Sequence, residues 1–266
     1  MKTKKTACFI TGCALILSAL ACNLAPSPAP QEASATIAPV AASTEETPPT
    51  GGPSESHSPC ENPYLPVVTG AAWNYQLTGP IPDTFTRSII GVEGDKFTDQ
   101  DTFGTGVTRQ SNWVCDNGNL TALNPAGGGS SAVDVDNYSA DFQATQSSGV
   151  TIPLTIAPGD AWTQTITLEG KHTISGTEIP TKTDFSNSCK AVGIESVTVP
   201  AGVFDAVRIE CETVMNITIT MNDSPIQQNI TILGANWYAE NVGLVKTFSA
   251  TNGVESTIEL TSYNIP

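Results

Sequence analysis

The sequence predicts an all-β protein, in which a single curved antiparallel meander sheet forms a barrel or a half-open barrel. Glycine and proline are frequent, with 22 and 19 among 266 residues, and they separate short alternating segments. No stretch shows the 3.6-residue hydrophobic period of a long helix. About ten to twelve consecutive strands would form a broad sheet, and broad sheets twist, curl, and close or cover their edges.

Residues 1–21 are typical of a bacterial lipoprotein signal peptide. Three lysines in Met1–Lys5 precede Ala7–Ala21, an uncharged apolar run that is too short to cross a hydrocarbon core of about 30 Å comfortably. Small residues precede Cys22, although Ala19 stands where such signals prefer leucine. We therefore expect cleavage before Cys22 and a diacylglycerol on its thiol, which would anchor the protein stably in a membrane. Ordinary secretory cleavage nearby is the alternative.

Residues 22–59 are predicted to form a disordered tether rich in Pro, Ser, Ala and Thr. Between Asn23 and Pro59 there are eight prolines and six serines but no aromatic residue. Such a segment cannot bury enough apolar surface to offset the entropy lost on ordering. As a coil it would span roughly 35 Å, which is enough to hold a domain away from a membrane surface. His57 lies in this segment, where we expect it to be solvated.

The chain is strongly acidic, with 26 Asp and Glu residues, 11 Lys and Arg residues and a formal net charge of −15. Loss of the signal peptide would leave 8 basic residues against the same 26 acidic ones, a balance of −18. This charge excludes nucleic-acid binding through phosphate neutralisation and discourages contact with anionic lipid headgroups. The expected partners are the membrane, through the lipid anchor, and an envelope protein or a hydrophobic small molecule.

Cysteine usage supports an exported protein. Of seven cysteines, two leave with the signal peptide and one carries the lipid, so four remain in residues 60–266: Cys60, Cys115, Cys189 and Cys211. An even number of cysteines in an exported domain predicts disulfides. A metal site of four thiolates is the alternative, but the sequence has no Cys-x-x-Cys pair to set its spacing.

The strand pattern selects one cysteine pairing. The segments on either side of Pro200-Ala-Gly202 alternate like strands, and Pro and Gly supply the dihedral angles of a tight turn. Antiparallel pairing about this turn places Cys189 opposite Cys211. The second disulfide would then join Cys60 to Cys115, and in the loop-entropy model the two bonds contribute roughly 3 and 4 kcal/mol.

The predicted strands follow one another from residue 73 to residue 263. The clearest two-residue turns are Glu169-Gly170 and Asn252-Gly253. In chain order the predicted strands are Trp73–Thr78, Phe85–Val92, Gly106–Cys115, Leu120–Leu123, Ala132–Gln143, Trp162–Leu168, Lys171–Ser175, Cys189–Val199, Val203–Thr213, Ile226–Leu233, Asn236–Ala239, Leu244–Ala250 and Ser256–Tyr263.

A short motif occurs twice. Leu65–Trp73 and Leu154–Trp162 share the pattern Leu-x4-Gly-x-Ala-Trp at a separation of 89 residues. We expect each copy to form a turn that leads into a strand, with the indole of Trp73 or Trp162 buried against the sheet. Four shared positions leave open whether the motif marks a duplicated half or a chance match.

Four segments together resemble a known family pattern. They are Asn62–Tyr75, the Pro-Gly-Asp-Ala-Trp motif ending at Trp162, Val197–Arg208 with its central Val-Pro-Ala-Gly, and Trp237–Lys246. Their order is similar to that of the TapB-like proteins and the related domain-of-unknown-function (DUF) family 3108, and the resemblance covers Cys60–Tyr263. The resemblance implies an exported protein with a curved antiparallel sheet that is part of a barrel. It assigns no catalytic residue to any position of this chain. Val203 and Asn241 depart from the pattern, where Thr and Gly are common.

These observations predict a membrane-anchored extracytoplasmic lipoprotein with a non-catalytic binding or structural role at the bacterial cell envelope. An alternative is a carrier of a hydrophobic or lipid ligand within the half barrel. Its ligand face would be formed by five aromatic residues that the motifs place on strands: Trp73, Tyr75, Trp162, Trp237 and Tyr238. In the structural interpretation, the same residues only pack the core.

The sequence predicts no catalytic residues, no cofactor and no metal site. A secreted hydrolase is a further alternative, but His172 is the one histidine of the domain and no G-x-S-x-G motif accompanies it. Two oxygen-rich groups could bind calcium in a calcium-dependent adhesion module. They lack the EF-hand spacing, so we expect solvated acidic loops. The groups are Asp134, Asp136, Asn137 and Asp141, and Glu93, Asp95, Asp99 and Asp101.

Overall fold

The structure is a computed structural model that describes residues 58–124, 132–135, 138–221 and 224–266. These residues lie in one compact unit, Ser56–Pro266. The predicted signal peptide, Cys22 and nearly all of the predicted tether lie outside the described residues. Within the described part of the chain, no helix has the length and hydrophobicity of a membrane span.

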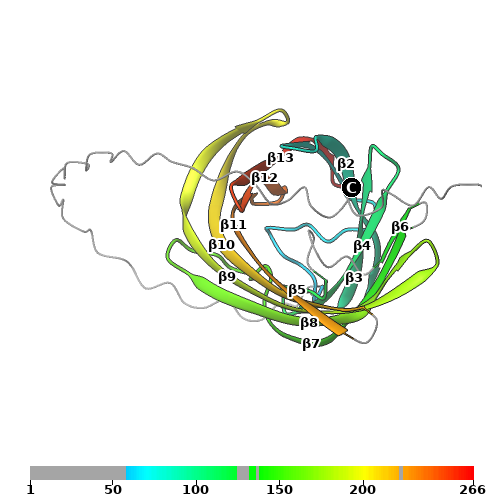
Figure 1. The fold of residues 1–266 in the computed structure, drawn as a ribbon. Coiled ribbons are helices and arrows are strands. Elements are labelled where there is room, and N and C mark those ends of the chain that lie inside the picture. The colour runs from blue at the N-terminus through cyan, green and yellow to red at the C-terminus, as the bar shows by residue number, and fades with distance from the viewer. Residues whose placement is uncertain (1–57, 125–131, 136–137, 222–223) are drawn as a thin grey trace, which may run out of the picture. The chain divides into compact units, whose positions relative to one another are not determined.

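Thirteen antiparallel strands form a single curved sheet (Figure 1). Its order is β3-β2-β1-β13-β12-β11-β10-β9-β8-β7-β6-β4-β5, and a further pairing of β3 with β4 joins the two ends. Twelve strands therefore form a barrel-shaped ring, and β5 pairs with β4 beside it. The strands are β1 (Ala72–Thr78), β2 (Asp83–Glu93), β3 (Lys96–Phe103), β4 (Thr108–Asp116), β5 (Asn119–Ala122), β6 (Ala132–Val135), β7 (Tyr138–Gly149), β8 (Ala161–Ile174), β9 (Thr177–Val199), β10 (Gly202–Met221), β11 (Ser224–Ala239), β12 (Gly243–Thr251) and β13 (Val254–Asn264).

The predicted fold class is confirmed, as are two of its turns. Pro200 and Ala201 join β9 to β10, and Asn252-Gly253 joins β12 to β13. Asn252 and Gly253 both have positive φ, 50° and 78°, as the tightest hairpin turns require. Several predicted strand boundaries are wrong because the strands of one half of the sheet are longer than their alternation suggests. Thus β9 has 23 residues and β11 unites two predicted strands.

The predicted turn at Glu169-Gly170 is wrong. Strand β8 runs through both residues, and the turn lies at Ser175-Gly176, where φ is 49° and 82°. Gly170 is opposite Phe142 of β7 and Thr181 of β9 in the register. A Cβ atom at Gly170 would lie 2.0 Å from the carbonyl oxygen of Asp141. This glycine therefore does not form a turn. It permits a close approach of two strands, because a side chain at this position would collide with β7.

Substituting Gly170→Ala should lower the free energy of unfolding by about 2 kcal/mol, because the backbone of β7 must move away from the new methyl group. Gly91→Ala is the matched control, since a Cβ at that strand position would meet no atom within 4 Å. Urea unfolding of the two variants measures the difference. Equal stability of the two variants would show that β7 does not constrain Gly170.

Both predicted disulfides are confirmed. Cys189 is opposite Cys211 in the register of β9 and β10, and the two are bonded. Cys60 is bonded to Cys115, so the segment before β1 is attached covalently to the end of β4.

The repeated motif forms the same local structure twice. Gly70 and Gly159 have positive φ, 88° and 99°, and each precedes its strand by two residues. The amide of Gly70 donates to the carbonyl of Ile89, and that of Gly159 donates to Ala191. The next residue in each copy donates back to the carbonyl three positions earlier. Each copy therefore sets the start of a strand against its following neighbour, β1 against β2 and β8 against β9.

Candidate functional site

Strand β3 places two carboxylates in the core. Its alternating residues Phe97, Asp99, Asp101 and Phe103 share one face, and Asp99 and Asp101 are only 4% and 3% exposed. In the register, Asp101 is opposite Arg87 of β2 on one side and Arg109 of β4 on the other. The sheet therefore aligns both arginines with the same carboxylate.

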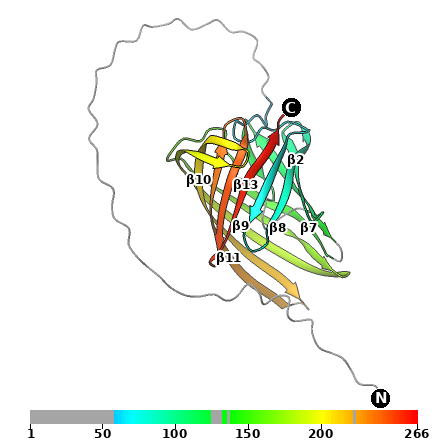
Figure 2. The same ribbon diagram turned by 90° about the horizontal axis from the view of Figure 1, so that it is seen from above.

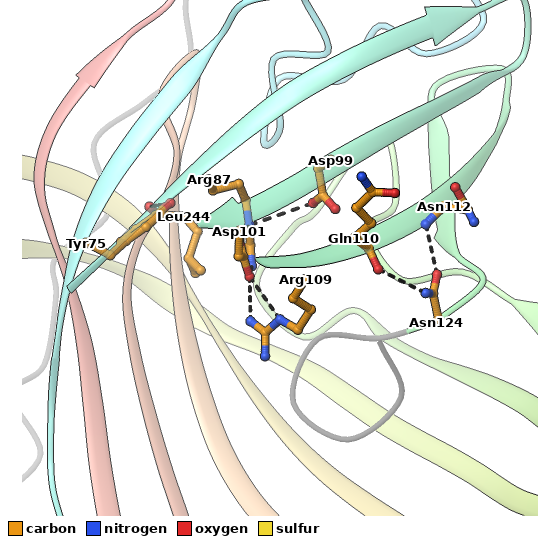
Figure 3. Close-up of polar contacts among 9 residues, drawn as sticks. All are labelled: Tyr75, Arg87, Asp99, Asp101, Arg109, Gln110, Asn112, Asn124 and Leu244. Atoms are coloured by element: carbon orange, nitrogen blue, oxygen red, sulfur yellow. Dashed lines mark hydrogen bonds and ion pairs between the residues drawn. The ribbon is translucent and has the colours of Figure 1, made fainter. Parts of the chain in front are cut away.

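The four charged side chains form a compact network (Figure 3). Arg87 donates from Nε and Nη2 to the two oxygens of Asp101, at 2.8 and 3.0 Å. Arg109 donates from Nε and Nη2 to Oδ2 of Asp101, with the Nε contact at 3.2 Å. Asp99 lies further away, with Oδ2 at 3.7 Å from Nε of Arg87. Both oxygens of Asp101 thus accept hydrogen bonds from guanidinium groups, whereas the ion pair of Asp99 with Arg87 is longer.

The two carboxylates have opposite pKa shifts. Burial acts to raise the pKa of Asp101, but Arg87 and Arg109 outweigh it and hold this pKa below its usual range. Burial raises the pKa of Asp99, and Arg87 only partly offsets the effect. Because two arginines balance two aspartates, the network is neutral when all four groups are charged. Its ion pairs link β2, β3 and β4, which is a structural role.

The interpretation of Asp99 and Asp101 as part of a solvated acidic loop is wrong. A detectable signal was present, because Phe97 and Phe103 flank them at a period of two, which predicts a strand with both aspartates on its apolar face. In the other acidic group, Asp141 is exposed on β7, and the side chains of Asp134, Asp136 and Asn137 lie outside the described residues. Among the side chains that the structure describes, no three His, Cys, Asp or Glu residues are grouped as metal ligands.

A cavity of about 850 Å³ lies where five loop segments meet, and we call it the end cavity. Its walls come from the segment before β1, the β4–β5 turn, the loop before β8, the β11–β12 turn and the C-terminus. Apolar residues form much of the lining, and the side chains of three asparagines, one glutamate and one serine complete it. The lining residues are Ser58, Pro59, Glu61, Asn62, Pro63, Pro66, Val67, Val68, Asn117, Gly118, Leu154, Asn241 and Ile265.

Buried polar contacts hold these walls together. Nδ2 of Asn62 donates to the carbonyls of Gly118 and Pro153, at 2.8 and 3.1 Å. The amide of Gly118 donates to the carbonyl of Pro59 at 2.8 Å, and the amide of Asn241 donates to that of Pro63 at 2.7 Å. With the Cys60–Cys115 disulfide, these bonds make the end cavity a preformed feature of the fold.

The five aromatic residues predicted as a ligand face do not line the end cavity. Trp73 and Tyr75 are 1% and 2% exposed, and their polar atoms donate to the carbonyls of Val242 and Leu244 at 2.6 and 2.9 Å. Tyr238 packs against the same hydrophobic cluster as Trp73 and Tyr75.

The other two aromatic residues occupy different places. Trp237 alternates with Tyr238 on β11 and donates to the carboxylate of Glu195. Trp162 is opposite Cys189 in the sheet, and its indole donates to the carbonyl of Thr151. All five aromatic residues belong to one hydrophobic cluster, in which Trp73, Tyr75 and Trp237 are buried and Trp162 and Tyr238 are half-buried. No motif in the sequence indicated that the five loop segments meet in the end cavity.

His172 lies within β8, opposite Ala140 and Ile179. Its ring is edge-on to Phe142, with 5.0 Å between the ring centroids, and burial lowers its pKa. It does not pair with the strand of Asp99 and Asp101, because β7, β6 and β4 lie between β8 and β3 in the sheet.

Three solved structures and one family model are similar to parts of this chain. A comparison with solved structures finds a protein of YmcC-like fold from Bacteroides fragilis, described as exported (15% identity, 76% of this chain, 99% of that chain, TM-score 0.46). It also finds a protein from Parabacteroides distasonis described as a lipoprotein (18% identity, 76% of this chain, 99% of that chain, TM-score 0.46). A third match is the hypothetical lipoprotein YmcC of Escherichia coli (10% identity, 76% of this chain, 87% of that chain, TM-score 0.36). No curated protein matches the chain in sequence. The DUF3108-like family model matches residues 137–260, which contain three of the four motifs. The resemblance to the DUF3108-like family is therefore confirmed, and residues 137–260 are the part of the chain that carries it.

Proposed function

We propose that this protein is a lipid-anchored extracytoplasmic lipoprotein of the bacterial cell envelope that binds a neutral apolar ligand in its end cavity, without catalysis. The observation that carries the proposal is the preformed cavity of about 850 Å³ with a largely apolar lining. Ligand sites are typically clefts of roughly 300–1,000 Å³, mostly apolar, with a few polar groups that fix orientation. The end cavity has this size and composition.

The location and the anchor are supported by the chain itself. A charged start, an apolar run and small residues precede Cys22. Two disulfides in the described domain suit an oxidising compartment outside the cytoplasm. The predicted tether begins at the predicted lipidation site, Cys22, and ends at Pro59, which is itself a wall residue of the end cavity. The cavity therefore lies at the point in the chain where the predicted tether ends and the domain begins.

Charge favours a neutral ligand. The whole chain carries a formal net charge of −15, and Glu61 is the one ionisable residue of the cavity lining. An anionic amphiphile would be repelled by this field, whereas a neutral acyl ester would lose only hydration. The interior of the barrel is a weaker candidate, because Trp73 and Tyr75 are buried and hydrogen-bonded to the backbone.

A non-catalytic role is supported by the chemistry of the lining. Acid–base or nucleophilic catalysis needs at least two groups within hydrogen-bonding reach of a substrate. The cavity lining offers one carboxylate, of Glu61, and one side-chain hydroxyl, of Ser58, but no imidazole or thiol, so no histidine is there to activate the hydroxyl. The buried carboxylate Asp101, on β3, is already saturated by arginines.

Filling the end cavity should abolish ligand binding. We expect Leu154→Trp to occupy it, because Leu154 lines it and is 38% exposed. The probe is N-phenyl-1-naphthylamine, a neutral apolar dye whose fluorescence rises on leaving water, added to the unlipidated mature chain from Cys22 onward. We expect at least a tenfold loss of dye affinity in Leu154→Trp.

Ile81→Trp is the matched control, because it adds the same ring to a loop residue that is 81% exposed and does not line the end cavity. This variant should bind the dye as the unmodified chain does. Equal dye binding by all three proteins, or no binding by the unmodified chain, would refute the end cavity as an apolar site. Thermal unfolding shows whether each variant remains folded.

A further inference from the structure

Half of strand β11 is an open sheet edge. Residues 224–239 pair with β10 along their whole length, but pairing with β12 begins only at Leu233. Among the described residues, no strand pairs with the other side of 224–232. Figure 2 shows the β10–β11 hairpin extending past the neighbouring strands. Alternate backbone N–H and C=O groups of this nine-residue stretch therefore point away from the sheet without a strand partner.

Apart from Pro225 at its start, the open edge lacks the usual protection against strand pairing. Natural proteins guard exposed edges with charged side chains, bulges or prolines. Between Glu212 and Glu240, the sequence contains one charged residue, Asp223, although the chain as a whole is strongly acidic. Pro225 lies at the start of the edge, and β10 and β11 pair here without a bulge. An uncharged, regular edge in so acidic a protein indicates a surface that pairs with another strand.

One side of the edge is apolar. Ile226, Ile230 and Ile232 share a face of β11 with Gln228, which lies between the first two of them. They continue an apolar patch of β10, because Ile226 is opposite Ile219 and Ile230 is opposite Met215. The outer positions Gln227 and Asn229 are polar and exposed. A strand added at this edge would gain apolar contacts on one face and amide hydrogen bonds on the other.

We propose that a second copy of this chain pairs antiparallel with β11 along this edge, so that two sheets become continuous about a two-fold axis. The edge is self-complementary. Pairing centred on Gln228 places Ile226 of each copy opposite Ile230 of the other, and Gln227 opposite Asn229. A copy also brings no charge to the contact, so the repulsion between two acidic chains acts over a longer distance and is screened by salt. Dimerisation should therefore strengthen as salt concentration rises.

A cysteine at the two-fold axis tests this geometry directly. Gln228→Cys would lie opposite itself, so mild oxidation should yield a disulfide-linked dimer. Thr218→Cys is the matched control, since Thr218 lies next to this edge on β10 with a strand on both sides. It should form no disulfide-linked dimer under the same oxidation. Both variants are made in the mature chain with Cys22→Ser, which removes the competing thiol.

A charge at the axis tests the energetics. Gln228→Lys would place two ammonium groups opposite each other, and we expect the dimer dissociation constant from sedimentation equilibrium to rise at least tenfold. Circular dichroism and thermal unfolding check that the variant is folded. A monomeric unmodified chain at every salt concentration would overturn the proposal. So would equal cross-linking of the two cysteine variants, or a dimer that Gln228→Lys leaves unchanged. None of these results would bear on dye binding in the end cavity.

Discussion

Replacing Asp101 by Asn is expected to lower the free energy of unfolding by about 3 kcal/mol. The change removes the carboxylate that pairs with both Arg87 and Arg109 and leaves two largely buried guanidinium groups without their shared counter-charge. The side chains of these arginines are 17% and 19% exposed, so some hydration remains, which places the effect at the lower end for a broken buried pair. Urea unfolding at pH 7 measures it.

Two residues away on the same strand, Asp99→Asn is expected to leave the stability at pH 7 unchanged or slightly higher. The raised pKa of Asp99 means that the folded state favours its neutral form, which an amide imitates. Glu178→Gln is the control for loss of a surface ion pair, because the Lys171–Glu178 pair is well exposed and should contribute less than about 1 kcal/mol. Equal losses in Asp99→Asn and Asp101→Asn would contradict the network as described.

The pH dependence of stability follows from the same two shifts. Asp101 has a folded pKa below its unfolded value, so its contribution is present above pH 3.8 and is lost as the pH falls through the folded pKa. Asp99 has a folded pKa above 3.8, so its charge costs stability at neutral pH, and that cost disappears as the pH falls through the folded value. The unmodified protein should therefore gain stability on mild acidification, and Asp99→Asn should lack this gain. In strong acid the unmodified protein should lose stability as Asp101 is protonated, and Asp101→Asn should show a smaller loss. Unfolding curves between pH 2 and pH 7 test both statements.

Removing the Cys60–Cys115 disulfide by replacing both cysteines with Ala is expected to lower stability by about 4 kcal/mol and to abolish dye binding in the end cavity. The bond closes a separation of 55 residues, for which the loop-entropy model gives about this magnitude. It also attaches the segment that supplies Pro59, Glu61 and Asn62 to the cavity walls. Release of that segment should open the cavity.

The second disulfide is the matched control. Removal of Cys189–Cys211, with a separation of 22 residues, is expected to cost about 3 kcal/mol. Neither cysteine lines the end cavity, so the folded variant should still bind the dye. Dye fluorescence and urea unfolding of both double variants separate the two effects. Retained dye binding without Cys60–Cys115 would show that the hydrogen bonds of Asn62 suffice to form the cavity.

Local chemistry was sufficient for the features that the sequence predicted correctly. The turns at Pro200-Ala201 and Asn252-Gly253 depend on dihedral angles that few residues adopt, and the Cys189–Cys211 bond follows from the register of one hairpin. Glu169-Gly170 failed for a reason that no local pattern contains. A glycine serves a turn or a close approach equally well, and only the neighbouring strand β7 distinguishes them.

The sequence by itself determined the fold class, the order of most strands and the two disulfides, because these depend on alternation, turn residues and chain direction, which are properties of short segments. Only the tertiary structure decided which faces meet. It aligned Arg87 and Arg109 with Asp101 across three strands and assembled the end cavity from five separate loops. It also left one side of residues 224–232 without a strand partner in the described part of the chain, because β12 is shorter than β10. Each of these depends on relative strand length and ring closure, and neither quantity is encoded within a single segment.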